Sequence, residues 1–198
     1  MRVNVLLFDD FETLDAFGPV EILGKVEGYE LHYGSLYGGE IISAQDTRIM
    51  TERIDLVNTD GILVIPGGKG TRTYVENEAF LAVLQMAAEQ AAYCLSICTG
   101  SALLAKTGLL DGKVATSNKK AFDWVRSTGE NVQWKEKARW AVDGKYYTSS
   151  GVSAGIDMTL GFVRDQLGME KAVEIANQIE YIWNYDCDND LFCRNEGV

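Results

Sequence analysis

The sequence has few histidines and prolines and no long apolar run. It contains one histidine, which argues against a zinc site with histidine ligands, and two prolines, which exclude long proline-rich linkers. No apolar run approaches the roughly 20 residues of a membrane span. Strand-like residues begin at Arg2, without the anatomy of a signal peptide. We therefore expect a cytoplasmic protein with no membrane segment.

Basic residues are also scarce. The 198 residues include 18 Lys and Arg against 29 Asp and Glu, so the net charge is −11. An acidic surface repels phosphate backbones, which argues against a nucleic-acid partner. Hydrophobic residues make up 46% of the chain and charged residues 24%, as in ordinary globular proteins. This length and composition suit a single α/β domain over residues 1–198.

The four cysteines, Cys94, Cys98, Cys187 and Cys193, form no C-x-x-C pair. In a cytosolic chain we expect free thiols, although Cys187 and Cys193 lie close enough in sequence to pair under oxidation. Only Cys98 sits in a sequence context that points to chemistry.

That context is the stretch Tyr93 to Lys106, YCLSICTGSALLAK. Its first half is short and apolar like a buried strand, and Ser101–Lys106 suits a helix. A strand that turns into a helix at a nucleophilic residue is a nucleophile elbow, and Gly100 provides the room or the positive φ that such a turn needs. The helix dipole is expected to lower the pKa of the Cys98 thiol. The alternative is that Cys98 is a small buried hydrophobe.

Strands and helices alternate along most of the chain, which predicts a mainly parallel sheet with helices on both faces. Pro19 is expected at the first position of a short helix, and Asn77 as the N-cap of another. Strands are expected at Arg2–Phe8, Tyr29–Leu36, Ile41–Ser43, Arg48–Thr51, Asp60–Ile65, Tyr93–Ile97, Val114–Thr116, Trp140–Val142 and Tyr146–Thr148. Asp143-Gly144 is expected to form a hairpin turn between the last two strands. Helices are expected to follow Pro19 and to cover Asn77–Gln90, Ser101–Lys106, Phe122–Arg126, Ile156–Gln166 and Lys171–Trp183.

Three small-residue loops follow strands of this sheet: Pro66–Gly70, Ile97–Gly100 and Ser149–Gly155. Ligands of parallel sheets bind at the carboxyl ends of the strands, so these loops are expected to surround one pocket. Asp15, just before the Pro19 helix, belongs to the same edge.

Cys98 would be the nucleophile of this pocket, with backbone N–H groups of Thr99 and of Gly67 or Gly68 as oxyanion donors. His32 is expected inside a strand, so a Cys–His dyad, and peptide hydrolysis with it, is disfavoured. Burial beside a thiolate would raise the pKa of Asp15 and let it deliver a proton. The alternative for Asp15 is an ordinary loop or capping residue.

The motifs SICTGSALLAKTGLLDGKVAT, LDAFGPVEIL, IPGGKG and SSGVSAGIDM together resemble the DJ-1/PfpI superfamily, and most of all its isonitrile hydratase-like branch. The resemblance covers Arg2 to about Tyr181. It implies a flavodoxin-like three-layer sandwich, a homodimer, and catalytic roles for Cys98, Asp15 and Thr99. It also implies addition of water to an isonitrile without metal or cofactor.

The chain departs from that branch in two places. Thr116-Ser117-Asn118 stands where a Thr-Thr-His stretch is common, and 182–192 replaces a segment that usually contains prolines, so the pocket wall is expected to differ. Cys98-Thr99 replaces the Cys-His of protease-type members, which argues against that activity. Regulator relatives carry a helix-turn-helix domain after this one, whereas this chain ends at Val198, so no DNA binding is expected.

Three functions are compatible with this pattern. The first is a hydratase or hydrolase of small molecules that uses Cys98. The second is a redox or stress sensor in which Cys98 oxidises to a sulfinate stabilised by Asp15. The third is a binding module without turnover, and a site without any role is the remaining alternative.

Overall fold

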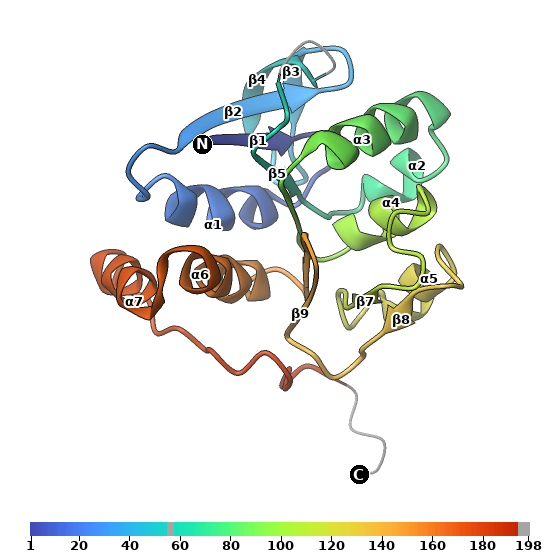
Figure 1. Ribbon diagram of the computed structural model, residues 1–198. Coiled ribbons are helices and arrows are strands. Elements are labelled where there is room, and N and C mark those ends of the chain that lie inside the picture. The colour runs from blue at the N-terminus through green and yellow to red at the C-terminus, as the bar shows by residue number, and fades with distance from the viewer. Residues whose placement is uncertain (55–57, 194–198) are drawn as a thin grey trace.

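A computed structural model describes residues 1–54 and 58–193. Over these residues the centre of the molecule is an eight-stranded sheet with the order β3-β4-β2-β1-β5-β6-β10-β9 (Figure 1). Its strands are β1 (Arg2–Leu6), β2 (Glu30–Ser35), β3 (Gly39–Ile42), β4 (Arg48–Arg53), β5 (Ile62–Ile65), β6 (Tyr93–Ser96), β9 (Trp140–Asp143) and β10 (Tyr146–Ser149). β7 (Val114–Ala115) and β8 (Gln133–Trp134) form a separate two-stranded sheet.

The six inner strands of the large sheet run parallel, and only the edge strands β3 and β9 are antiparallel to their neighbours. The predicted mainly parallel sheet is therefore confirmed. The hairpin expected at Asp143 and Gly144 is also present, with Asp143 opposite Tyr146. The loop between the paired Asp143 and Tyr146 consists of Gly144 and Lys145, and Gly144 has the positive φ, 59°, that a primed turn needs at its first loop position.

Helices cover both faces of the sheet, which confirms the three-layer arrangement (Figure 1). One face carries α1 (Thr13–Leu23), α6 (Ala154–Leu167) and α7 (Met169–Gln178). The other carries α2 (Thr71–Tyr74), α3 (Glu78–Gln90), α4 (Gly100–Lys106) and α5 (Phe122–Arg126). Asn77 caps α3 as predicted, because its side-chain oxygen accepts a hydrogen bond from the Phe80 amide at 3.0 Å.

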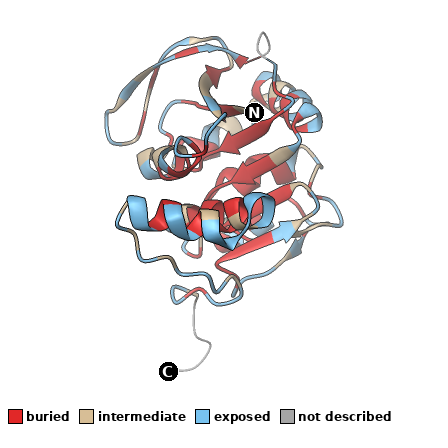
Figure 2. Cartoon of the chain, turned by 60° about the vertical axis from the view of Figure 1, so that its left-hand side comes forward, coloured by how far each residue is buried: buried red, intermediate tan, exposed pale blue. Residues whose placement is uncertain are grey.

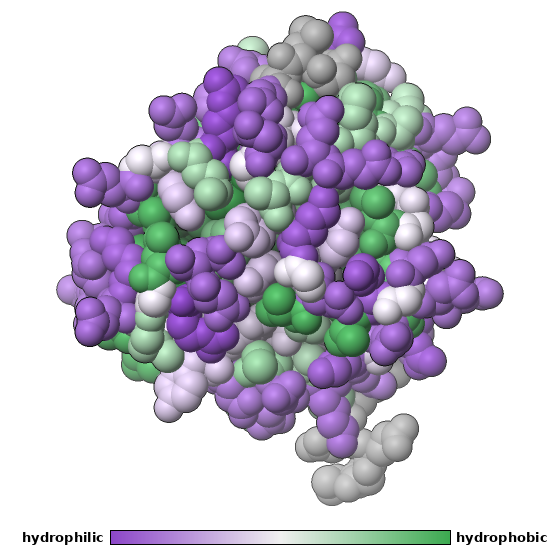
Figure 3. Space-filling view, in the orientation of Figure 1, coloured by the Kyte–Doolittle hydropathy of each residue, from purple (hydrophilic) through white to green (hydrophobic). Residues whose placement is uncertain are grey.

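The core lies between these layers. Val5, Val64 and Leu95 are register partners on three adjacent central strands, and all three are fully buried. Figure 2 shows the inner strands buried and the outer sides of the helices exposed. The face seen in Figure 3 is mainly hydrophilic, with small scattered apolar patches. None of the helices in the described ranges is long and apolar enough to cross a membrane.

The start of α1 differs from the expectation. The helix begins at Thr13, so Asp15 lies in its first turn and Pro19 lies inside it rather than at its first position. Proline removes one helical hydrogen bond, but the buried Ala16, Ile22 and Leu23 pack this helix into the core. Packing therefore outweighs the local preference of the Gly-Pro pair.

The C-terminal part of the chain also differs. α7 ends at Gln178 rather than Trp183, and Glu180 has a φ of 52°, which no helix continues through. The Tyr181 hydroxyl and the Trp183 ring N–H instead donate hydrogen bonds to Asp157 of α6, each at 3.1 Å. The short elements α2 and β8 were not predicted. The four cysteines are thiols rather than disulfides, as expected, and the chain end at Val198 lies outside the described residues.

A buried ion pair holds this C-terminal segment. The Arg139 Nε donates to the Asp157 Oδ2 at 2.7 Å, and both side chains are almost wholly buried. Asp190 lies next to the same guanidinium, with its Oδ2 3.8 Å from the Arg139 Nη1. Burial raises the pKa of Asp157 more than Arg139 lowers it. The cost of burying the two charges therefore offsets much of their attraction, and the main effect of the pair is to fix the position of the C-terminal segment.

Removal of one partner would leave Arg139 buried without its main counter-ion. We expect Asp157→Ala to lower the free energy of unfolding by about 3 kcal/mol. The measurement is urea denaturation followed by circular dichroism. Glu174→Ala is the control, because its exposed pair with Lys171 contributes at most about 0.5 kcal/mol. Equal effects of the two variants would contradict the anchoring role of Asp157.

Candidate active site

The nucleophile elbow is present at Cys98, between β6 and α4. Cys98 itself has a φ of 57°, the left-handed region that side chains other than glycine rarely occupy. Gly100 does not supply this angle; it supplies space, because a Cβ there would lie 2.5 Å from the Ile65 carbonyl oxygen. Strain at a residue in a left-handed conformation is common where a side chain must be held in a reactive position.

Two serine hydroxyls hold the strained peptide. The Ser117 Oγ donates to the Cys98 carbonyl oxygen at 2.7 Å, and the Ser101 Oγ donates to the same oxygen at 3.1 Å. Both serines are fully buried. Neither role was predicted. Ser117 is 19 positions from Cys98, and no local pattern links the two residues.

Asp15 lies beside Cys98, as predicted. Its carboxyl is fully buried, and the Gly67 amide donates to its Oδ2 at 3.0 Å. The other oxygen, Oδ1, accepts no hydrogen bond from the described residues. Burial raises the pKa of Asp15 from 3.8 to about 8, with a smaller contribution from Glu12, and this confirms the predicted direction. The carboxyl is therefore neutral at pH 7.

The prediction for the Cys98 thiol is wrong in direction. The side chain is 6% exposed, and burial, with the adjacent Asp15 second, raises its pKa above the ordinary value. The backbone amides of Thr99 and Val152 lower the pKa, as does the Thr99 hydroxyl, but by less. Loss of water around the sulfur outweighs the favourable field at the start of α4.

The glycine amides do not serve as the expected oxyanion donors. The Gly67 N–H is bonded to Asp15, and the Gly68 N–H donates to the Thr99 Oγ1 at 3.1 Å. The two glycines thus position Asp15 and Thr99. The amides that face the sulfur are those of Thr99, as predicted, and of Val152, which sequence reasoning did not single out within the loop Ser149–Gly155.

A cavity of about 300 Å³ is lined by residues next to this pair, although neither Cys98 nor Asp15 itself lines it. Leu14, next to Asp15, and Val152, whose amide faces the sulfur, both line it. The full lining is Leu14, Asn118, Lys119, Lys120, Ser150, Gly151, Val152, Ser153 and Phe192. Asn118 and Phe192 belong to the two stretches that depart from the isonitrile hydratase-like pattern, so both departures reach the cavity wall.

Lys119 in that wall was also not predicted. Its Nζ donates to the Ala138 carbonyl oxygen at 2.6 Å and to the Thr116 Oγ1 at 2.9 Å. Burial lowers the pKa of Lys119 to about 8. The amine is therefore already hydrogen-bonded within the wall.

The sequence profile of the DJ-1/PfpI family matches residues 1–165. The chain belongs to the DJ-1/PfpI family. The resemblance expected from the motifs is thus confirmed.

Individual members of the DJ-1/PfpI family extend this result. The isonitrile hydratase of Pseudomonas putida is 30% identical over 183 residues, which cover 91% of this chain and 78% of that protein. A deglycase of Thermococcus kodakarensis is 30% identical over 152 residues, covering 75% of this chain and 89% of that protein. A solved ThiJ/PfpI family protein from Pseudomonas syringae superposes with a TM-score of 0.84 at 26% identity, over 92% of this chain and 76% of that one.

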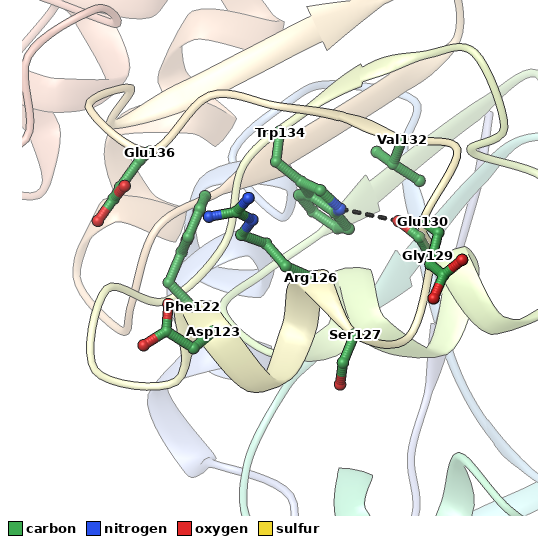
Figure 4. A pocket seen from close by; sticks show the side chains of 9 residues that line it. All are labelled: Phe122, Asp123, Arg126, Ser127, Gly129, Glu130, Val132, Trp134 and Glu136. Carbon is green, nitrogen blue, oxygen red and sulfur yellow. Dashed lines mark hydrogen bonds between the residues drawn. The ribbon is translucent and has the colours of Figure 1, made fainter.

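A larger pocket of about 560 Å³ lies elsewhere on this DJ-1/PfpI protein (Figure 4). It is lined from α5 and β8, and Arg126 and Trp134 are among its residues. Unlike the 300 Å³ cavity, it is not lined by any sequence neighbour of Asp15 or by Val152. His32 is also remote, because it lies in β2, and β1 and β5 separate that strand from β6. In the described ranges, no three His, Cys, Asp or Glu side chains are grouped to hold a metal.

The raised pKa of Asp15 gives a stability prediction. The folded protein keeps a proton on Asp15 between pH 4 and about 8, whereas the unfolded chain releases it. This contribution to stability is complete below pH 4 and is lost as the pH rises to about 8. We expect Asp15→Asn, which keeps an acceptor for Gly67, to be increasingly more stable than the wild type across this range in urea titrations.

Glu12→Gln is the matched control. Glu12 acts on Asp15 only through its charge, so this variant should retain most of the wild-type pH dependence. If wild type and Asp15→Asn lost stability in parallel between pH 4 and 8, Asp15 would not be neutral in the folded protein.

Proposed function

We propose that this protein is a cysteine-dependent hydratase or hydrolase of small molecules, with Cys98 as nucleophile, Asp15 as proton donor and Thr99 as a positioning group. The addition of water to an isonitrile is the reaction that we propose first. The observation that carries the proposal is a carboxylic acid with a pKa of about 8 and one free oxygen, buried against a thiol. The 30% identity to the Pseudomonas putida isonitrile hydratase supports the choice of substrate.

In the first step, the thiol adds to the terminal carbon of the isonitrile. The Cys98 sulfur forms a bond to this carbon, Asp15 gives its proton to the same carbon, and the thiol proton passes to Asp15. The product is a thioformimidate, R–N=CH–S–Cys98. Asp15 loses one proton and gains the thiol proton as the C–S bond forms. The buried site therefore does not need to hold a free thiolate before the reaction.

In the second step, water attacks the carbon of the thioformimidate and protonates the nitrogen. The resulting R–NH–CH(OH)–S–Cys98 collapses to the formamide R–NH–CHO. The C–S bond breaks, and the hydroxyl proton returns to the sulfur through Asp15. The amides of Thr99 and Val152 stabilise negative charge on the sulfur as it leaves.

The sensor alternative is less well supported by the geometry. Peroxides oxidise thiolates that are exposed and have a low pKa, whereas Cys98 is buried and has a raised pKa. A carbonyl substrate remains within the proposed class, because the thiol adds to a carbonyl carbon in the same position. The identity to the Thermococcus kodakarensis deglycase makes such compounds the second panel to assay.

The cavity of about 300 Å³ limits the proposal to small substrates. We also propose that the protein is a homodimer, as the resemblance implied, and that it is cytoplasmic, as expected from the sequence. Exposed apolar residues on the C-terminal segment, among them Ile182 and Tyr185, are compatible with a contact between copies.

Variants of the reactive pair test this function. With an alkyl isonitrile as substrate and chromatography of the N-alkylformamide, we expect Cys98→Ala to lose at least about 10³-fold in kcat/KM. Asp15→Asn should lose about 10²-fold or more, because it cannot transfer the proton. Cys94→Ala is the control, since Cys94 is a buried cysteine of β6, the strand that precedes the elbow, and its thiol faces the Ala88 carbonyl oxygen. Full activity of Asp15→Asn would refute the role of the acid.

The pH dependence is a separate test. Asp15 donates a proton only while it is protonated, so kcat/KM should fall as the pH rises through about 8. The profile is measured from pH 5.5 to 9.5 at constant ionic strength. A rate that rises with pH through this range would mean that ionisation of the thiol, not the acid, limits the reaction.

A further inference from the structure

Arg72 lies near the elbow, and the proposed mechanism does not use its chemistry. It lies in α2, directly after the loop that holds Asp15 and Thr99. Its Nη1 donates to the Thr71 Oγ1 at 3.1 Å, and that oxygen lies 3.1 Å from the Thr99 Oγ1. A chain of hydrogen bonds therefore connects the guanidinium to the residue beside Cys98.

An aromatic ring holds the guanidinium in place. The Arg72 Cζ lies 3.8 Å from the ring centroid of Trp124, which belongs to α5. Such stacking orients the planar guanidinium and leaves its edge donors free. The contact joins two helices, α2 and α5, that are 50 residues apart in sequence, so it is a product of the tertiary structure.

The guanidinium has no carboxylate partner among the described residues, although the chain carries 29 acidic residues against 18 basic ones. Only one of its nitrogens makes a hydrogen bond in the described part of the chain. The charged form of Cys98 favours the charged form of Arg72, so the two groups are close enough to interact. An arginine that is oriented, unpaired and near a nucleophile is suited to bind an anion.

We propose that Arg72 is a specificity residue that binds a carboxylate of the substrate beside Cys98. The planar fork of the guanidinium matches the two oxygens of a carboxylate, whereas a neutral substrate gains nothing from it. The inference deepens the proposed function and rests on it in one respect, namely that Cys98 is the reacting group. The preferred substrates are then small acids that carry the reactive carbon and a carboxylate.

The test compares two alkylating reagents that differ in charge. Iodoacetate and iodoacetamide alkylate the same thiolate, so the ratio of their rates at Cys98 cancels the thiolate fraction. The rates are measured by mass spectrometry at pH 7, where Asp15 is neutral, and the ratio is divided by that of 2-mercaptoethanol. We expect a normalised ratio above one in the wild type and about fivefold lower in Arg72→Gln.

Two variants accompany this comparison. Arg72→Lys keeps the charge but not the fork, so it should restore part of the ratio. Arg126→Gln is the control, because it also removes one positive charge, but from α5 at the pocket of Figure 4. It should leave the ratio unchanged. The unfolding midpoint of each variant is measured alongside, so that a loss of fold is recognised.

Three results would overturn the inference. Unchanged rates with both reagents in Arg72→Gln would mean that the guanidinium does not meet an anion at the site. An equal fall in both rates, which also leaves the ratio unchanged, would mean that Arg72 acts on the thiol and not on the incoming molecule. A similar change in Arg126→Gln would mean that the ratio reports net charge alone.

The alkylation ratio does not require turnover. It therefore tests the role of Arg72 even if the protein does not hydrate isonitriles. If isonitriles are hydrated, isocyanoacetate and its methyl ester form the matching substrate pair. Arg72→Gln should then lower kcat/KM about fivefold for the acid and leave the value for the ester unchanged. Equal losses for acid and ester would contradict a specificity role even if the enzyme is an isonitrile hydratase.

Discussion

The burial of the Asp15 carboxyl against the Cys98 thiol is the constraint on which the rest of the site depends. A carboxyl without water favours its neutral form, and so does a thiol. The pair therefore keeps its protons at neutral pH, although each side chain would have an ordinary pKa in water. The Gly67 amide and the amides of Thr99 and Val152 act in the opposite direction and keep the charged states within reach during a reaction.

The sheet order brings these groups together. β1, β5 and β6 are adjacent and parallel, so their carboxyl ends meet at one edge. α1 carries Asp15 from the first of these strands, the loop after β5 brings Gly67, and the elbow after β6 brings Cys98. A Cβ at Gly67 would lie 2.5 Å from the Thr99 nitrogen, so this convergence leaves no room for any other residue at position 67.

The C-terminal segment connects the far end of the chain to the same region. Asp157 receives hydrogen bonds from Arg139, Tyr181 and the Asn184 amide, and so fixes the path of the chain after α7. Farther along this path, Phe192 forms part of the cavity wall. The cavity wall thus includes Phe192 from a segment that departs from the isonitrile hydratase-like pattern, and a difference in substrate would arise there.

The sequence by itself determined the alternation of strands and helices, the elbow at Cys98 and the edge at which the small-residue loops meet. These follow from local patterns, because apolar strands, caps such as Asn77 and the Asp143-Gly144 turn act over a few residues. The sequence also indicated that burial would raise the pKa of Asp15. Pro19 shows the limit of this reasoning, since packing of α1 outweighed its local preference.

Only the tertiary structure decided the direction of the Cys98 pKa, because burial depends on residues from many elements. It also decided that the amides of Gly67 and Gly68 bond to Asp15 and Thr99, that Ser117 supports the elbow, and that Arg72 stacks on Trp124. Each of these contacts joins positions far apart in the chain. Local periodicity carries no information about such pairs, because the distance between them is fixed only when the layers pack.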